Sequence, residues 1–425
     1  MKIKPRHLFQ FVFIFFINLT AIPFLELAIC SFTSSQEFIF VRIFTILSLL
    51  LFSFFSWKII TPIAKIFFTD RIIPGRTLLV YFIIILTGSL FFFYKIYNEP
   101  EGMWDASSRY NMMAKHYALE YIENNRFMIY KSFWDGNPPF YSLQISFLII
   151  LWGNWSIFIP IILSYLYFIA ISILLFSFYD INQNKILNPG MTAIALSVIY
   201  PSVSENASHL CADVPIAFYL IMTLSLFFIF INSIKKHSSI ILIFIIFSGS
   251  ILTSLKNEGV LLLIPFLIML YFSAGKRIEP IRFFLIFFLV SLPSFTLLAA
   301  SKFTVDRIYV KPLNLEIFLT NFTTIARYKL MIKYFFTVHV LHTLGVPFYL
   351  IFKSSPSSLR YFLPLGASFI LYHFVFIIND FDLVWLLETA YRRITFHFYP
   401  ALSLIVLYTL NTERKHNALF HNQHI

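Results

Sequence analysis

The chain has 425 residues, of which 59% are hydrophobic and only 12% are charged, and its mean hydropathy is +0.79. A soluble domain carries roughly a quarter charged residues, so this composition excludes an ordinary water-soluble fold and fits a chain whose outer surface meets lipid. The formal net charge is +12. The basic residues lie mostly in short segments between apolar runs, a pattern that indicates membrane topology rather than nucleic-acid binding.

Apolar runs long enough to cross a bilayer recur along the whole chain. A spanning helix needs about 20 mostly apolar residues. We therefore expect an all-α polytopic transmembrane protein with about twelve spans. Residues 1–425 would form a single domain, in which 1–76 supplies two additional N-terminal spans. The spans are predicted near residues 8–30, 38–57, 77–95, 157–177, 189–203, 212–232, 239–255, 259–273, 281–299, 333–352, 361–378 and 394–411.

One further apolar run, 139–152, is short for a span, and we expect it to form a re-entrant or interfacial helix. If it does not cross, and if the N-terminus is cytoplasmic, basic residues such as Lys235 and Lys236 also lie on the cytoplasmic side, as the positive-inside rule requires. Both termini are then cytoplasmic. Two long loops, 96–138 and 300–332, are predicted to lie on the extracytoplasmic side.

The loop at 96–138 carries most of the polar chemistry. Apolar residues recur at helical spacing in 105–124 and predict an amphipathic helix that lies on the membrane surface. Asp105 stands at its start, where an Asp is also an ordinary helix N-cap, so a catalytic and a capping interpretation both stay open. The apolar stripe of this helix comprises Tyr110, Met113, Ala114, Tyr117, Ala118 and Tyr121.

Short motifs follow one another in a definite order over residues 77–273. They are Asp105-Ala106, Pro138-Pro139-Phe140-Tyr141, Leu151-Trp152-Gly153, Tyr200-Pro201, Asp213-Val214-Pro215, Leu252-Thr253 and Lys256-Asn257-Glu258-Gly259. This ordered set resembles the GT-C glycosyltransferases, in the branch of protein O-mannosyltransferases and lipid A aminoarabinose transferases. A weaker resemblance continues over 385–400. The chain departs from the family pattern at Asn137, where His is common, and in having no Glu beside Asp105.

The resemblance implies an inverting transfer of a sugar from a polyprenyl-phosphate donor to a hydroxyl or phosphate of a glycan, lipid or protein acceptor. It implies that Asp105 is the general base and that Asp213 is a second acidic group that orients the acceptor. Cations would stabilise the leaving phosphate. The candidates for this role are Lys256, Arg392, Arg393 and Lys131. The candidates for substrate binding are Trp134, Asp135, Asn137 and Glu258.

Each candidate also has a plain structural interpretation. Asp213 could cap a helix, and Lys256 could anchor a helix end at the interface or pair with Glu258. Arg392 and Arg393 could anchor the last span and pair with nearby acids. If the transferase interpretation is right, the acids and the cations should converge on one cavity at the outer face.

No His/Cys cluster at metal-ligand spacing, no phosphate-binding Gly loop and no nucleophilic Ser elbow occurs in the sequence. We therefore predict no certain cofactor, and a divalent metal has no ligand cluster to support it. Two other classes stay open: a transporter or flippase for lipid-linked sugars, and a polysaccharide polymerase or ligase. We expect a bacterial inner-membrane protein with its active site facing the periplasm, membrane lipid as a partner, and no nucleic acid.

Overall fold

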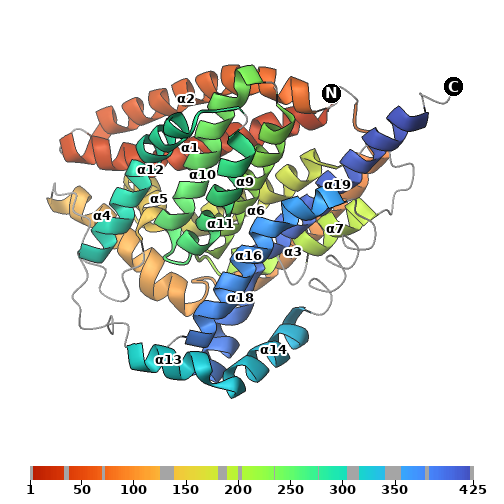
Figure 1. Cartoon of the computed structure of the whole chain (residues 1–425). Coiled ribbons are helices and arrows are strands. Elements are labelled where there is room, and N and C mark those ends of the chain that lie inside the picture. Colours follow the sequence, from red (N-terminus) through yellow and green to blue (C-terminus); the bar gives the residue numbers. More distant parts are fainter. Residues whose placement is uncertain are drawn as a thin grey trace.

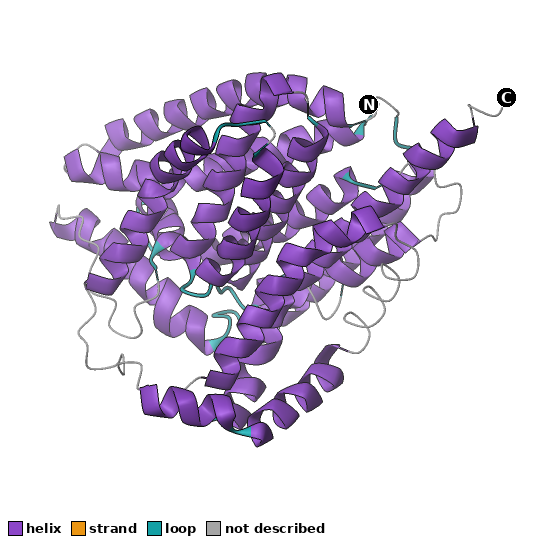
Figure 2. Cartoon of the chain, viewed as in Figure 1, coloured by secondary structure: helices purple, strands orange, loops and turns teal. Residues whose placement is uncertain are grey.

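The computed structural model is helical throughout the part of the chain that it describes (Figure 2). No strand occurs among those residues, which confirms the predicted all-α fold class. The described residues are 3–32, 38–68, 72–124, 138–179, 189–199, 203–233, 235–275, 277–303, 315–339, 356–378 and 382–421.

Eight of the described helices are long and apolar enough to cross a membrane. This finding confirms a polytopic helical membrane protein. The eight helices are α1 (Pro5–Phe32), α2 (Phe38–Phe67), α3 (Gly75–Asn98), α6 (Phe158–Ser177), α9 (Asp213–Asn232), α10 (Lys235–Leu255), α12 (Pro280–Phe303) and α16 (Pro356–Ile378).

The other four predicted spans correspond to shorter elements or lie partly outside the described residues. Helix α7 (Pro189–Val198) has 10 residues and α11 (Gly259–Ala274) has 16. The apolar part of α19 (Phe398–His421) ends at Leu410. The predicted span at 333–352 lies mostly outside the described residues. The count of twelve and the cytoplasmic termini stay predictions.

Helix α9 lies at the centre of the bundle (Figure 1). It packs against α6, α10 and α19, and almost all of its side chains are buried. A helix that is apolar on every side is typical of such a buried position. Because Asp213 is its first residue, α9 holds that carboxylate at one end of the bundle.

Helix α1 packs into this bundle as well as against α2. Gln144 Nε2 donates a hydrogen bond of 2.8 Å to the Leu19 carbonyl oxygen. The hydroxyls of Thr20 and Tyr219 lie 3.0 Å apart. Helix α1 is therefore part of the core, whereas most of α2 is exposed. The assignment of 1–76 as two additional spans stays a prediction.

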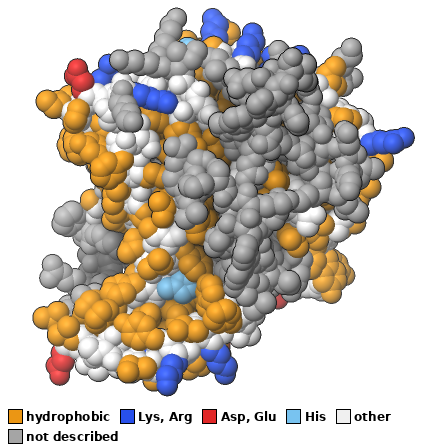
Figure 3. All heavy atoms as spheres, turned by 45° about the vertical axis from the view of Figure 1, so that its right-hand side comes forward, with side chains coloured by type: hydrophobic (Ala, Val, Ile, Leu, Met, Phe, Trp, Pro, Cys, Tyr) orange, Lys and Arg blue, Asp and Glu red, His pale blue; other side chains and the backbone are white. Residues whose placement is uncertain are grey.

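Apolar side chains also cover much of the outer surface. In Figure 3 they cover much of the coloured surface between the upper and lower ends of the view, and most Lys, Arg, Asp and Glu side chains lie toward those ends. Exposed residues on α2 and α12 include Phe44, Leu47, Phe54, Phe284 and Phe288. Such a surface is unfavourable in water and favourable against lipid tails. Together with the eight apolar helices, it identifies an integral membrane protein.

The helix predicted at 105–124 forms as two consecutive elements, η2 (Ala106–Tyr110) and α4 (Asn111–Asn124). Its predicted apolar stripe is mostly buried, and α4 packs against α5 (Phe140–Trp152). The rings of Tyr110 and Tyr141 meet edge to face, with centroids 5.6 Å apart. The stripe therefore contacts protein rather than the membrane surface. Helix α5 is only about 20 Å long, so a re-entrant or interfacial position for it stays a prediction.

The remaining described helices are short and lie near the end of the bundle that carries Asp213. They are α8 (Val203–Ser208), α13 (Leu315–Thr323), α14 (Ile325–His339), α17 (Leu383–Leu386), η4 (Leu387–Tyr391) and α18 (Arg392–Phe396). In Figure 1, α13 and α14 lie across the bottom of the bundle, below α18. Arg327 Nε on α14 donates to the Ile377 carbonyl oxygen at the end of α16, at 2.7 Å, which ties α14 to the bundle.

Candidate functional site

The Asp213 carboxylate is buried at the start of α9 and is surrounded by cationic or polar nitrogen groups. Its Oδ1 atom accepts a hydrogen bond from Lys256 Nζ at 2.6 Å and lies 3.0 Å from His397 Nε2. Its Oδ2 atom lies 3.5 Å from Arg393 Nε. The side chain makes no cap hydrogen bond, because Ala212 holds the N-cap position. The alternative of a plain cap therefore does not apply to Asp213.

Lys256 reaches this carboxylate from the sharp turn between α10 and α11. The turn depends on Gly259, where an added Cβ atom would lie 1.8 Å from the Leu252 carbonyl oxygen. Only glycine fits such a close backbone approach. The turn thus directs the Lys256 ammonium group toward the N-terminus of α9, whose positive dipole end also favours a carboxylate.

Asp105 lies at the exposed side of the same group of residues. Its Oδ2 atom accepts a hydrogen bond of 2.5 Å from an Arg393 terminal nitrogen, and its Oδ1 atom lies 3.4 Å from an Arg109 terminal nitrogen. The Asp105 side chain makes no helix-cap hydrogen bond, and its backbone is helical. Asp105 is therefore an ion-pairing residue in this structure rather than a plain cap.

Arg393 connects the two carboxylates. It projects from α18 and contacts Asp105 and Asp213 with different nitrogen atoms. Burial by itself would lower the pKa of the Arg393 guanidinium, but Asp213 and Asp105 together raise it above its ordinary value. Arg393 therefore stays charged, and it separates two acids that would otherwise repel each other.

His397 lies one helical turn after Arg393 and is almost fully buried. Burial lowers the pKa of its imidazole below the ordinary value, although Asp213 acts in the opposite direction. The ring is therefore neutral at pH 7. A neutral ring whose Nε2 carries the proton can donate to Asp213, which leaves Lys256 and Arg393 as the full charges on that carboxylate.

The loop before Asp105 contacts the segment before Asp213, and this contact fixes the two residues relative to each other. The Met103 amide donates to the His209 carbonyl oxygen at 3.2 Å. Gly102 has a φ of 73°, and an added Cβ atom would lie 2.6 Å from the same His209 oxygen. Leu210, which is buried, has a φ of 56°, a conformation that is rare for a residue with a branched side chain. Strained backbone of this kind often accompanies a functional site.

We call these connected residues the charged cluster: Arg109, Asp105, Arg393, Asp213, Lys256 and His397. Exposure falls along it, from 27% for the Arg109 side chain through 15% for Asp105 and Arg393 to 1% for Asp213. A ligand that approaches from outside therefore meets Arg109, Asp105 and Arg393 first. Lys256 and His397 lie behind them.

The structure thus brings together four of the residues singled out from the sequence: Asp105, Asp213, Lys256 and Arg393. Sequence reasoning missed Arg109 and His397. Each stands four residues after a member of the cluster, a spacing that places two side chains on one helix face and could have indicated both.

The other candidates are not in the cluster or cannot be placed. Lys131, Trp134, Asp135 and Asn137 lie outside the described residues. Arg392 begins α18, but its side chain is not among those described. Glu258 is partly buried, and its Oε2 atom has no hydrogen-bond partner within the described part of the chain. Lys256 forms its ion pair with Asp213 rather than with Glu258, the alternative partner considered from the sequence.

The cluster brings three cations, Arg109, Arg393 and Lys256, into contact with two carboxylates, Asp105 and Asp213. Within the described residues, no group of three or more His, Cys, Asp or Glu side chains could hold a metal ion. Burial, together with nearby Asp213, raises the pKa of the adjacent Cys211 thiol to about 12. Cys211 therefore stays protonated and cannot act as a thiolate nucleophile.

What the arrangement can do chemically follows from these contacts. The guanidinium groups of Arg109 and Arg393 can bind a phosphate, and the Asp105 carboxylate between them can accept a proton. No protein-family model matches the chain, and no curated protein and no solved structure matches it. The geometry of the charged cluster is therefore the ground on which its function has to be inferred.

Proposed function

We propose that this protein is an inverting glycosyltransferase. It would move a sugar from a polyprenyl-phosphate carrier to an acceptor hydroxyl or phosphate at the extracytoplasmic face of the membrane. The acceptor would belong to a glycan, a lipid or a protein. The membrane would be a bacterial inner membrane, with the charged cluster facing the periplasm.

The observation that carries this proposal is the arrangement of Arg109, Asp105 and Arg393 at the exposed edge of the cluster. A lipid phosphate is a leaving group whose negative charge grows as the bond to the sugar breaks, and fixed cations stabilise that charge. An acceptor hydroxyl must lose a proton in the same reaction, and a carboxylate can take it. Both requirements meet within these three side chains.

Binding of the donor would also free Asp105, the proposed base, from its ion pairs. Each Asp105 oxygen contacts a guanidinium group, so an acceptor hydroxyl has to compete with Arg109 and Arg393 for the same two oxygens. A donor phosphate competes for the same guanidinium groups, because Arg binds phosphate through two parallel hydrogen bonds. Asp105 then becomes available as the phosphate enters.

The transfer itself balances as a single displacement. The acceptor oxygen attacks the anomeric carbon of the sugar, and the hydroxyl proton passes to Asp105. The bond between the anomeric carbon and the phosphate oxygen breaks, and its electron pair goes to that oxygen. Because attack and departure occur on opposite faces, the configuration inverts. Arg393 and Arg109 stabilise the polyprenyl phosphate that leaves.

The buried members of the cluster would act as positioning residues. Asp213 fixes the Arg393 guanidinium from behind, and Lys256 and His397 stabilise the Asp213 carboxylate. A side chain held by several partners keeps its geometry during the reaction, which preserves orientation. Glu258 would bind substrate near this position. The five candidates whose side chains are not described, Arg392, Lys131, Trp134, Asp135 and Asn137, keep their proposed roles in phosphate and substrate binding.

The test is a donor-consumption assay on the purified protein in lipid nanodiscs. The donors are polyprenyl phosphates that carry a hexose, an N-acetylhexosamine or an amino-pentose, with a membrane glycolipid and glycan extract as acceptor. We expect the wild type to release polyprenyl phosphate from at least one donor. We expect Asp105→Asn to slow release by roughly 100- to 10,000-fold, the usual contribution of a general base.

The matched control is Glu99→Gln, which neutralises an exposed acid six positions earlier in the same segment. It should release polyprenyl phosphate at the wild-type rate. Two results would overturn the proposal. One is that the wild type consumes none of the donors, and the other is that Asp105→Asn keeps the full rate.

A further inference from the structure

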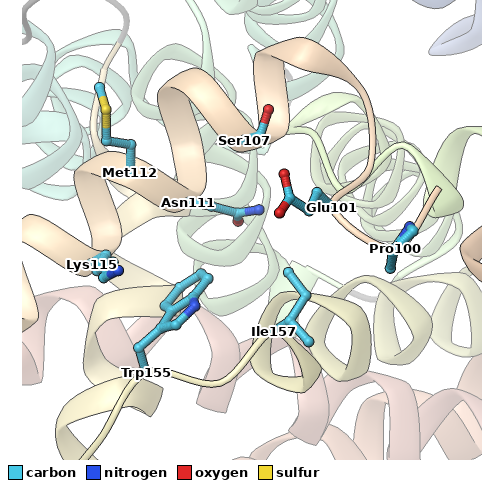
Figure 4. Close-up of a pocket in the computed structure, with 8 residues that line it drawn as sticks. All are labelled: Pro100, Glu101, Ser107, Asn111, Met112, Lys115, Trp155 and Ile157. Carbon is cyan, nitrogen blue, oxygen red and sulfur yellow. The ribbon is translucent and has the colours of Figure 1, made fainter.

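A second site lies on another face of the helix that carries Asp105. Ser107, Asn111 and Lys115 are spaced by four residues, so they share one face, and they line a pocket of about 440 Å³ (Figure 4). Residues two positions apart on a helix point to different faces, so Asp105 is directed away from this pocket. A volume of this size falls in the range of roughly 300–1,000 Å³ that small-molecule sites occupy.

Asn111 is the polar residue whose burial needs an explanation. It is 4% exposed, and neither atom of its side-chain amide, Nδ2 or Oδ1, has a hydrogen-bond partner among the described residues. A buried amide without partners is costly, because both groups have lost water and gained nothing in return. A ligand in this pocket could satisfy both groups at once, if it offers an acceptor and a donor close together.

The other walls of the pocket narrow the chemistry of that ligand. Trp155 supplies a broad apolar surface, and the Lys115 ammonium lies 5.9 Å from the centre of a Trp155 ring. Glu101 supplies a carboxylate from the loop after α3. In Figure 4, Asn111 lies between Glu101 and Trp155, so polar groups and an aromatic surface border the same space.

These walls fit a sugar ring better than the parts of a phospholipid. A phosphate offers only acceptors, so it could pair with Lys115 but could not donate to the Asn111 Oδ1 atom, and Glu101 would repel it. An acyl chain would leave the Asn111 amide unpaired. A sugar ring carries neighbouring hydroxyls, which both donate and accept, and an apolar face of C–H groups that can stack on the indole of Trp155.

We propose that this pocket binds one ring of a carbohydrate, at a site separate from the charged cluster. Asn111 and Glu101 hydrogen-bond its hydroxyls, Trp155 stacks on its face, and Lys115 closes one edge. The site does not depend on the proposed transfer reaction. It would hold a glycan in the same way if the protein were not a transferase.

The experiment is a saturation-transfer NMR titration on the full chain in nanodiscs, prepared without glycosidic detergent and without any donor. The probes are methyl glycosides of glucose, galactose, mannose and N-acetylglucosamine. We expect at least one glycoside to bind. We expect Asn111→Leu and Trp155→Ala each to raise its Kd by about tenfold or more, since each variant removes a principal contact. Trp152→Ala is the matched control, because Trp152 is exposed nearby and does not line the pocket; it should leave the Kd unchanged.

Several outcomes would overturn the proposal. The first is that no glycoside binds the wild type. The second is that a glycoside binds but neither Asn111→Leu nor Trp155→Ala changes its Kd. The third is that glycerophosphoethanolamine binds and the glycosides do not. If Arg393→Met abolishes glycoside binding while Trp155→Ala does not, the sugar occupies the charged cluster instead. Failure of the donor-consumption assay leaves this result untouched, because the titration contains no donor.

Discussion

Arg393 determines whether Asp105 and Asp213 can lie close together as carboxylates. Its two contacts, at 2.5 Å and 3.5 Å, place one delocalised cation between two acids. A lysine could not reach both, because its charge is a single point rather than a planar fork. The side chain is mostly buried, so the attraction is only weakly screened by water. The same geometry suits a guanidinium that exchanges a carboxylate for a phosphate.

His397 gives the cluster a predictable dependence on pH. In the folded protein the pKa of His397 is lowered by burial, below the value of about 6.5 in an unfolded chain. As pH falls through 6.5, the unfolded chain takes up a proton that the folded protein resists. The contribution of His397 to stability is therefore complete above that pH and is lost progressively below it.

We predict that the thermal unfolding midpoint of the wild type falls more between pH 7 and pH 5.5 than that of His397→Gln. Glutamine keeps an amide that can donate to Asp213, and it does not titrate. The measurement is intrinsic fluorescence during heating at one scan rate. Equal falls in the two proteins would show that His397 is not the group that titrates.

At the scale of elements, the site depends on how the loop before η2 meets the segment between α8 and α9. Gly102 and His209 are the points of contact, through a hydrogen bond from the neighbouring Met103 amide. Any side chain at Gly102 would need to shift this contact by several tenths of an ångström or more. A shift there is transmitted to Asp105, which follows three residues later.

We predict that Gly102→Ala lowers the rate of sugar transfer and costs stability. The positive φ alone costs about 1–2 kcal/mol for a residue with a Cβ atom. Gly75→Ala is the matched control, since nothing lies within 4 Å of its added Cβ atom. Donor consumption and the unfolding midpoint are measured for both. A Gly102→Ala protein that behaves like Gly75→Ala would remove the link between this contact and the site.

Local signals in the sequence predicted some elements well. The helix at 105–124 and its buried stripe followed from a repeat of 3.6 residues, which is a property of neighbouring residues alone. Its partner did not follow, because packing on α5 rather than on the membrane surface is a long-range event. The transferase interpretation led us to expect that Asp213 and Arg393 converge, but no local pattern predicts their contact, which spans 180 residues and depends on how α9, α18 and α19 meet.

At the scale of the whole molecule, composition predicted a polytopic helical membrane protein because lipid requires an apolar surface and satisfied backbone groups. The number of spans was harder to predict. The hydropathy of an apolar run does not indicate where the backbone turns, as it does at Gly259. It also does not indicate where a helix ends early, as in α7. The predicted spans at 189–203 and 259–273 correspond to α7 and α11, which have 10 and 16 residues, and the count of twelve stays a prediction.

The distribution of basic residues also predicts which side the cluster faces. In a background without cysteine, with Cys30 and Cys211 replaced, we predict that Glu99→Cys is labelled by a membrane-impermeant maleimide on intact spheroplasts. Arg282→Cys, exposed at the start of α12, should be labelled only after the membrane is opened. The opposite pattern would place the charged cluster on the cytoplasmic side.

The most direct measurement is an experimental structure of the protein in nanodiscs with polyprenyl phosphate bound. The account predicts that phosphate oxygens lie within hydrogen-bond distance of Arg393 and Arg109, and that Asp105 has lost its contact with at least one of them. Asp213, Lys256 and His397 should stay in place. A phosphate bound elsewhere, with the Asp105–Arg393 pair intact, would contradict the account.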